Sequence, residues 1–157
     1  MSILRARLPQ AHLTLVGDGD LRTELERHAG RLLLGAHVKF VGYVQDVTTV
    51  LPAFDVFALA SRTEGTSLTL LEAAATALPI VATRVGGNAE IVVDGESGYL
   101  VPAARPELFA AALEVVARRK DRQVMGRRGR EDVVARYDLA KTVAAYDTLY
   151  AEVLRFA

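Results

Sequence analysis

The sequence contains no cysteine among its 157 residues. This excludes a disulfide framework and a thiolate metal site, and a reducing cytoplasm is the expected compartment. Nineteen basic and nineteen acidic residues cancel, which argues against nucleic acid as the main partner. No apolar run approaches the ~20 residues that a membrane span needs, and nothing near Met1 reads as a signal peptide. Peripheral contact with a membrane stays open.

The chain does have enough apolar residues, 51%, to build the core of one domain. Short β-prone runs alternate with amphipathic segments, and this rhythm predicts an α/β fold with a doubly wound parallel sheet. Three more helices are expected after the last strand, from Pro106, over about 122–136 and over 139–154. The predicted strands are 13–16, 38–41, 55–60, 80–83 and 99–101.

The segment from Ser61 to Glu90 forms a strand, helix, strand unit. After the strand at 55–60 comes a loop, then a helix that Thr66 or Ser67 can cap and Pro79 ends. The next strand runs into a pair of glycines. One apolar stripe at helical spacing is expected on this helix, formed by Leu68, Leu71, Ala75 and Leu78.

Two carboxylates, Glu64 in the loop and Glu72 in the helix, have seven residues between them. Glu72 lies about 40° from Leu68 around the helix. An unpaired carboxylate beside an apolar stripe is costly, so we expect Glu72 to point towards the loop end. The free N–H groups of residues 66–69 open the same helix and suit phosphate oxygens. The pattern predicts an anion and a polyol bound side by side, although a solvated Glu64 and an arginine-paired Glu72 fit the same spacing.

Ligands in open α/β sheets bind beyond the carboxyl ends of the strands. The loops that should converge there are 17–20, 42–44, 60–68 and 83–87. Gly17 and Gly19 allow close approach of the backbone to a ligand, and a tight turn containing a helix cap is the alternative. The pair is not a dinucleotide fingerprint, because Arg22 stands where the third glycine would be.

A series of short segments occurs in a fixed order between about residues 8 and 154. The segments are Val16-Gly17-Asp18-Gly19, Val41-Gly42-Tyr43-Val44, Glu64-Gly65, Leu70-Leu71-Glu72-Ala73, Leu78-Pro79-Ile80-Val81-Ala82-Thr83, Val85-Gly86-Gly87, Glu90-Ile91-Val92 and Asp94-Gly95-Glu96-Ser97-Gly98-Tyr99-Leu100-Val101. Together they closely resemble the retaining glycosyltransferases of family 4. The two glutamates alone would be a weak signal, and it is the ordered set that makes the resemblance specific.

The resemblance implies a Rossmann-like domain of the GT-B fold, the C-terminal, donor-binding half of a two-domain hexosyltransferase-like enzyme. In the family this domain opens with a strand and a loop whose arginine and lysine grip the diphosphate, and neither Arg5 nor Arg7 matches those positions. We therefore expect residues 1–157 to be one domain without its first strand and without the acceptor-binding domain. Such a fragment should turn over little or nothing alone, because catalysis needs the closed cleft.

The resemblance also implies roles for the glutamates. Glu72 would hold the ribose hydroxyls, and Glu64, the candidate catalytic residue, would lie beside the transferred sugar and its phosphate. The substrate would be a UDP-, GDP- or ADP-sugar, with no metal and no other cofactor. The family often has glycine where Ser67 stands, so the identity of the sugar stays open.

Further donor contacts follow from the same resemblance. The turn Gly17-Asp18-Gly19 would lie near the diphosphate or nucleoside, and Tyr43 and Val44 near the base. Gly86, Gly87 and Glu90 are expected to be mainly structural. Sugar hydroxyls and diphosphate oxygens would be held by the amides of Gly65, Thr66, Ser67 and Leu68.

Other functions fit parts of the pattern. A nucleotide-binding module without catalysis, or a subunit completed by a partner chain, would need the same pocket. A sugar-nucleotide epimerase would not need this glutamate spacing, and a glycoside hydrolase needs a second acid opposite Glu64. His12, His28 and His37 are expected to be surface or packing residues, away from the ligand loops. The acceptor and the oligomeric state are left open.

Overall fold

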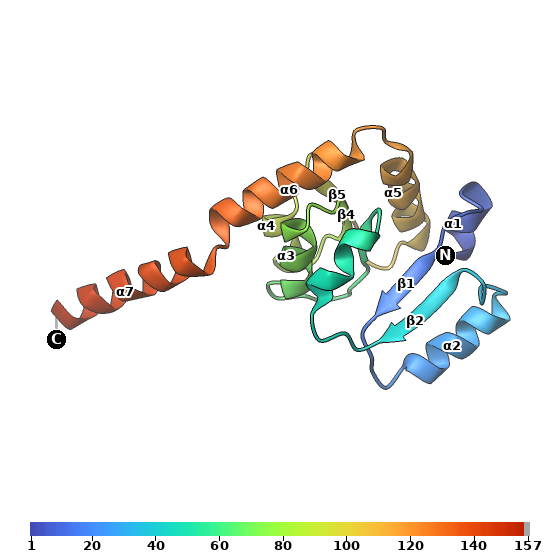
Figure 1. Cartoon of the computed structure of the whole chain (residues 1–157), viewed down its shortest axis with the longest axis horizontal. Helices are drawn as coiled ribbons and strands as arrows, with labels where there is room; N and C mark the ends of the chain where they lie inside the picture. The colour runs from blue at the N-terminus through green and yellow to red at the C-terminus, as the bar shows by residue number, and fades with distance from the viewer. Residues whose placement is uncertain (156–157) are drawn as a thin grey trace.

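The computed structural model describes residues 1–155 and has a parallel α/β architecture (Figure 1). Strand β1 (Leu13–Val16) pairs with β2 (Val38–Gly42). Strand β4 (Ile80–Thr83) pairs on one side with β3 (Phe57–Leu59) and on the other with β5 (Gly98–Val101). All these pairs are parallel. The predicted α/β class is confirmed, and β3 is shorter than the predicted 55–60.

The strands form a two-stranded and a three-stranded sheet instead of one continuous sheet. Every residue of β4 is buried, because β4 has a partner on both sides. Within residues 1–155, β1 and β3 each pair on one side only, and both are partly exposed. These two strands therefore carry unpaired edges that could accept a further strand.

Two apolar clusters lie on opposite faces of the three-stranded sheet, because successive side chains of a strand alternate. Ile80 and Ala82 join the helices α3 (Leu68–Ala75), α4 (Asn88–Ile91) and α6 (Arg122–Arg136). Val81 packs instead with Val101, with Val116 of α5 (Pro106–Arg118) and with Met125. The sheet is thus covered on both faces, as in a doubly wound fold.

The buried face of α3 agrees with the predicted stripe in part, because Leu78 after the helix is buried and Leu71 packs against the core. Leu70, Ala73 and Ala74 are buried, whereas Leu68 is 70% exposed and Ala75 is also exposed. Consecutive leucines and alanines put apolar side chains on neighbouring faces of this helix. Periodicity alone therefore could not show which face is buried. The alanine row is chosen because small side chains let α3 approach the sheet and α6 closely.

The N-terminal part is less deeply packed. Helix α1 (Ser2–Arg7) ends before Pro9 and buries Leu4. Helix α2 (Arg22–Arg31) buries only Ala29. Two 3-10 turns, η1 (Val47–Thr49) and η2 (Leu51–Ala53), precede β3.

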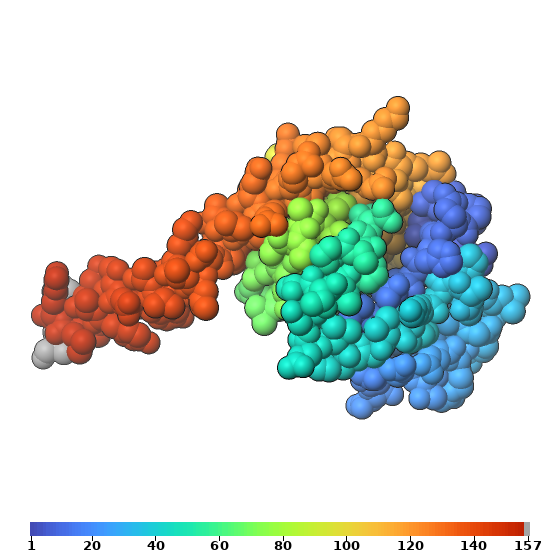
Figure 2. All heavy atoms as spheres, in the orientation of Figure 1, coloured from blue at the N-terminus to red at the C-terminus, as the bar shows by residue number. Residues whose placement is uncertain are grey.

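Helix α7 (Leu139–Arg155) projects away from the rest of the molecule (Figures 1 and 2). None of its residues is buried, and Tyr146, Tyr150 and Val153 are all more than half exposed. The helix itself was predicted, but its projection was not. No helix within residues 1–155 is both long and apolar enough to cross a membrane.

Candidate functional site

The loop after β3 holds Glu64 in a defined position. The Ser61 hydroxyl donates a hydrogen bond to Glu64 Oε1 at 2.6 Å, and the Glu64 side chain is half-buried. The Ser61 carbonyl in turn accepts a hydrogen bond from Thr83 Oγ1 at 2.7 Å. The carboxylate is therefore connected to the buried end of β4 through one intermediate residue.

The loop after β4 supports the same segment from the other side. The Gly87 amide donates to the Gly65 carbonyl at 2.9 Å. Gly86 has a φ of +48°, and a Cβ on Gly86 would lie 1.7 Å from the Glu64 carbonyl oxygen. Only glycine permits this backbone approach. The geometry agrees with the structural role predicted for the glycine pair, and Glu90 is exposed on α4.

The first turn of α3 presents free amides beside Glu64. Ser67 occupies the N-cap position, one of the two predicted, but its side chain makes no capping bond to the helix. Its buried hydroxyl instead lies 3.1 Å from Thr69 Oγ1. Within residues 1–155, the amides of residues 65–69 have no hydrogen-bond acceptor. These N–H groups remain available to an anion.

Glu72 lies on α3 four residues after Leu68, a rise of about 6 Å along the helix axis. Glu72 is half-buried, and its side-chain carboxylate has no hydrogen-bond or ion-pair partner in the described part of the chain. The alternative in which an arginine pairs with Glu72 is therefore not what the structure shows. A half-buried carboxylate without a partner is suited to bind donor groups of a ligand.

The loops after β1 and β2 lie together. The Gly17 amide donates to the Gly42 carbonyl at 2.8 Å. Asp18 accepts from the Gly19 amide and from Arg22, each at 2.8 Å, and these two donors, the amide first, hold the pKa of Asp18 below its ordinary value. Asp18 thus stabilises the turn in which it lies. Its contact with Arg22 was not predicted from the sequence.

The two residues predicted beside a base differ in exposure. Tyr43 follows the β2 strand and is 77% exposed, whereas Val44 is half-buried. An exposed aromatic ring next to a ligand loop offers a flat surface on which a base could stack.

The structure brings the predicted residues into two groups, loops 17–20 with 42–44 and loops 61–66 with 83–88. Sequence reasoning missed three residues that support the second group, namely Ser61, Thr83 and the fully buried Asn88, whose side-chain amide donates to the Thr83 carbonyl at 2.9 Å. The one local signal was the spacing Ser61-x-x-Glu64, which places a hydroxyl near a carboxylate in a tight loop.

The histidines lie where the sequence placed them. His12 and His37 stack with ring centroids 4.9 Å apart, at the amino ends of β1 and β2, and His37 Nδ1 lies 3.3 Å from the Ala11 carbonyl. His28 is exposed on α2. Among the residues the structure describes, no cluster of three or more histidine, aspartate and glutamate side chains could hold a metal ion.

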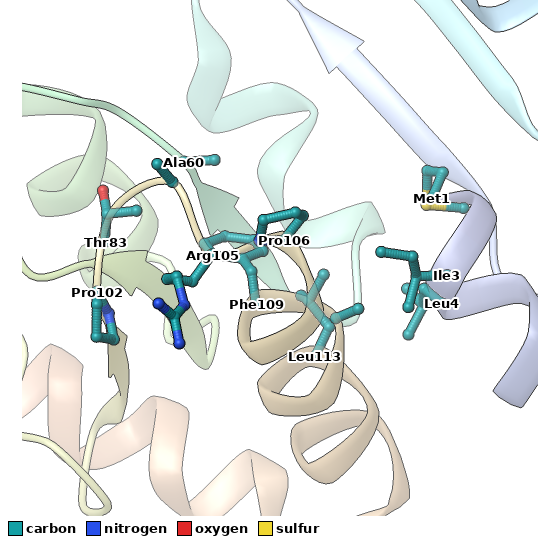
Figure 3. A pocket seen from close by; sticks show the side chains of 12 residues that line it. Met1, Ile3, Leu4, Ala60, Thr83, Pro102, Arg105, Pro106, Phe109 and Leu113 are labelled. Atoms are coloured by element: carbon teal, nitrogen blue, oxygen red, sulfur yellow. The ribbon is translucent and has the colours of Figure 1, made fainter.

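A cavity of ≈ 230 Å³ lies between α1, α5 and the ends of the central strands. Figure 3 shows Ile3 and Leu4 of α1 opposite Phe109 and Leu113 of α5, with Thr83 further along the wall. Its lining is mostly apolar, so it does not suit a diphosphate. The candidate site is therefore assigned to the loops, which this cavity borders at Ala60 and Thr83.

Parallel strands with ligand loops at their carboxyl ends, a free helix N-terminus and two partly buried glutamates define a Rossmann-like domain of the type found in GT-B glycosyltransferases. The chain belongs to the family described as "Glycosyl transferases group 1", whose model matches residues 1–119.

Two curated relatives illustrate the similarity. The lipopolysaccharide core biosynthesis glycosyltransferase LpsE of Rhizobium meliloti is 36% identical over 93% of this chain and 43% of its own length. The N-acetyl-alpha-D-glucosaminyl L-malate synthase of Bacillus anthracis is 34% identical over 92% of this chain and 38% of its own length. The chain therefore spans about two fifths of these relatives.

A solved structure gives the same picture. The crystal structure of HepE from Anabaena in complex with UDP has a TM-score of 0.81 and 26% identity, over 99% of this chain and 44% of that one. Nearly the whole of the present chain, including the region of α7, thus has a counterpart in a longer protein.

Proposed function

We propose that this chain is the donor-binding part of a retaining glycosyltransferase, which moves a sugar from a nucleotide diphosphate sugar to an acceptor. One observation carries the proposal: Glu64 is held at 2.6 Å by Ser61 and lies three residues before Ser67, the N-cap of a helix with free amides. The family membership and the UDP and UDP-glucose complexes of HepE support the same ligand class.

Each group has a chemical role in this proposal. Glu72 accepts two hydrogen bonds from the vicinal ribose hydroxyls, as a carboxylate can do with a diol. The amides of residues 65–68 hold sugar hydroxyls and diphosphate oxygens, and they stabilise the charge that develops on the departing diphosphate. Glu64 lies at the transferred sugar. The turn 17–19 approaches the diphosphate or nucleoside, and Tyr43 and Val44 contact the base.

The acceptor side belongs to polypeptide beyond the segment shared with the relatives, which are more than twice as long. We propose that an acceptor-binding domain forms the other half of the cleft and that closure is needed for turnover. The unpaired edges of β1 and β3 and the exposed α7 fit a chain that has more structure to pack against. A partner subunit that supplies the same surfaces is the second candidate.

Titration with UDP, GDP and ADP tests donor binding. A ligand that binds only the folded chain stabilises it by about 2.7 kcal/mol when its concentration is 100 times Kd. For a chain of this size that is a rise in melting temperature of roughly 5 to 11 °C. We expect at least UDP to produce such a rise in a thermal unfolding assay. If none of the three nucleotides changes the melting temperature, the proposed function is wrong.

Alanine substitution separates the two glutamates. Glu72→Ala should weaken binding of UDP and of UDP-glucose alike, by roughly tenfold or more, because hydrogen bonds to a charged group contribute about 1.5–3 kcal/mol. Glu64→Ala should weaken UDP-glucose binding and leave UDP binding nearly unchanged. Isothermal titration calorimetry measures both affinities, with exposed Glu131→Ala of α6 as control. Equal losses for the two ligands in Glu64→Ala would refute its position beside the sugar.

A further inference from the structure

The Glu64 carboxylate has one hydrogen-bond donor in the described structure, the Ser61 hydroxyl. The separation of 2.6 Å is typical of a charge-assisted O–H···O⁻ bond. Glu64 sits in a loop, where an unrestrained glutamate would sample many rotamers. The contact therefore selects one orientation of the carboxylate, using Oε1 and leaving Oε2 without a protein partner.

Ser61 is itself fixed by buried groups. Its carbonyl accepts from Thr83 Oγ1 at 2.7 Å, and Thr83 is 3% exposed at the end of β4. The Thr83 carbonyl accepts from the side-chain amide of Asn88, which is fully buried. The hydrogen bonds therefore run from the core through Thr83 and Ser61 to the carboxylate, and Gly87 holds the following Gly65 carbonyl.

We propose that Ser61 is a positioning residue that orients the Glu64 carboxylate towards the sugar of the donor. The inference rests on the proposed function, since it assigns Ser61 a task only if Glu64 meets a sugar. The Ser61 hydroxyl donates a hydrogen bond to Oε1 and has no other hydrogen-bond partner within residues 1–155, so it acts on the ligand through Glu64. Without the hydroxyl, the Glu64 carboxylate is present but no longer held in one orientation. The contribution of the sugar to the binding free energy should then fall, and that of the nucleotide should stay the same.

The test compares Ser61→Ala with Ser61→Thr, which restores a hydroxyl, and with Thr63→Ala, which removes an exposed hydroxyl from the same loop. Calorimetry gives the affinities for UDP and UDP-glucose. We expect Ser61→Ala to reduce the preference for UDP-glucose over UDP by about tenfold at constant UDP affinity. Ser61→Thr and Thr63→Ala should keep the preference of the unsubstituted chain. An unchanged preference in Ser61→Ala, or equal losses for both ligands, would overturn the proposal.

A ligand-free measurement separates this inference from the proposed function. Nuclear magnetic resonance relaxation of the Glu64 side-chain carbons should show an ordered side chain in the unsubstituted chain and in Ser61→Thr, and a mobile one in Ser61→Ala. Equal mobility in all three proteins would refute the positioning role. Ordered behaviour that depends on Ser61, in a chain that binds no nucleotide, would support the contact and refute the donor-binding function.

Discussion

Gly86→Ala is expected to weaken UDP-glucose binding by at least about 100-fold, a loss of about 2.7 kcal/mol in binding free energy. The new Cβ would lie 1.7 Å from the Glu64 carbonyl oxygen. That oxygen belongs to backbone, so the clash can be relieved only by moving the Glu64 loop or the turn at Gly86. Either movement breaks the bond from the Gly87 amide to Gly65 and displaces the free amides that follow. Calorimetry with UDP-glucose measures the loss.

Gly95→Ala is the matched control for this substitution. Gly95 also has a left-handed backbone, with a φ of +83°, but no atom lies within 4 Å of the position its Cβ would take. Gly95→Ala should therefore lower the free energy of unfolding by about 1 kcal/mol, the cost of an alanine in that conformation. The affinity of this variant for UDP-glucose should lie within about twofold of that of the unsubstituted chain. If Gly86→Ala binds as well as Gly95→Ala while circular dichroism shows both folded, the loop is not held as described.

Much of the fold could be predicted because each element carries its own local signal. Strand β4 reads as four apolar or β-branched residues between a proline and a charged turn, and its bounds were correct. Helix α6 was also placed at its observed bounds, 122–136. The division into two sheets could not be predicted from composition, because it depends on which strand edges meet in space.

The buried face of α3 shows a second limit. Leu68 belongs to the predicted stripe and Leu70 to the observed buried face. Both are leucines in the first turn of the helix, so helical spacing alone does not choose between them. What decides between them is which residues face the core cluster and α6 in the folded chain. Ala73 and Ala74 lie in that cluster, where small side chains allow close packing, whereas Leu68 is exposed.

Some residues of the candidate site were predicted from the sequence, and others were found only in the structure. Glu64, Glu72 and the helix amides were predicted from the ordered set of motif segments, because each segment is contiguous along the chain. The contact between Ser61 and Thr83 spans 22 residues and depends on the register of β3 against β4. Arg22 was seen only as a departure from a glycine fingerprint, whereas in the structure it bridges Asp18 and Glu26. Contacts between the loops of different strands cannot be predicted from the sequence alone, because they depend on how the strands are paired.

Gly126→Ala is expected to destabilise the fold by about 3 kcal/mol, at the upper end of what overpacking a core costs. Gly126 lies in α6, where its Cβ would come within 1.9 Å of the Ala77 carbonyl oxygen and 3.1 Å of the Pro79 nitrogen. Both neighbours are backbone atoms of the turn between α3 and β4, so the helix must move away as a unit. Urea denaturation gives the change in the free energy of unfolding.

Gly30→Ala in α2 tests whether packing, and not helix propensity, causes this loss. Gly30 is also helical, but nothing lies within 4 Å of its Cβ position. Alanine there should stabilise the chain by about 0.5 kcal/mol, because alanine is favoured over glycine in helices. The same substitution in two helices is thus expected to change stability in opposite directions. A stabilising Gly126→Ala would show that α6 does not pack against the Ala77 turn, and α3 would then lose the contact that fixes the end opposite the candidate site.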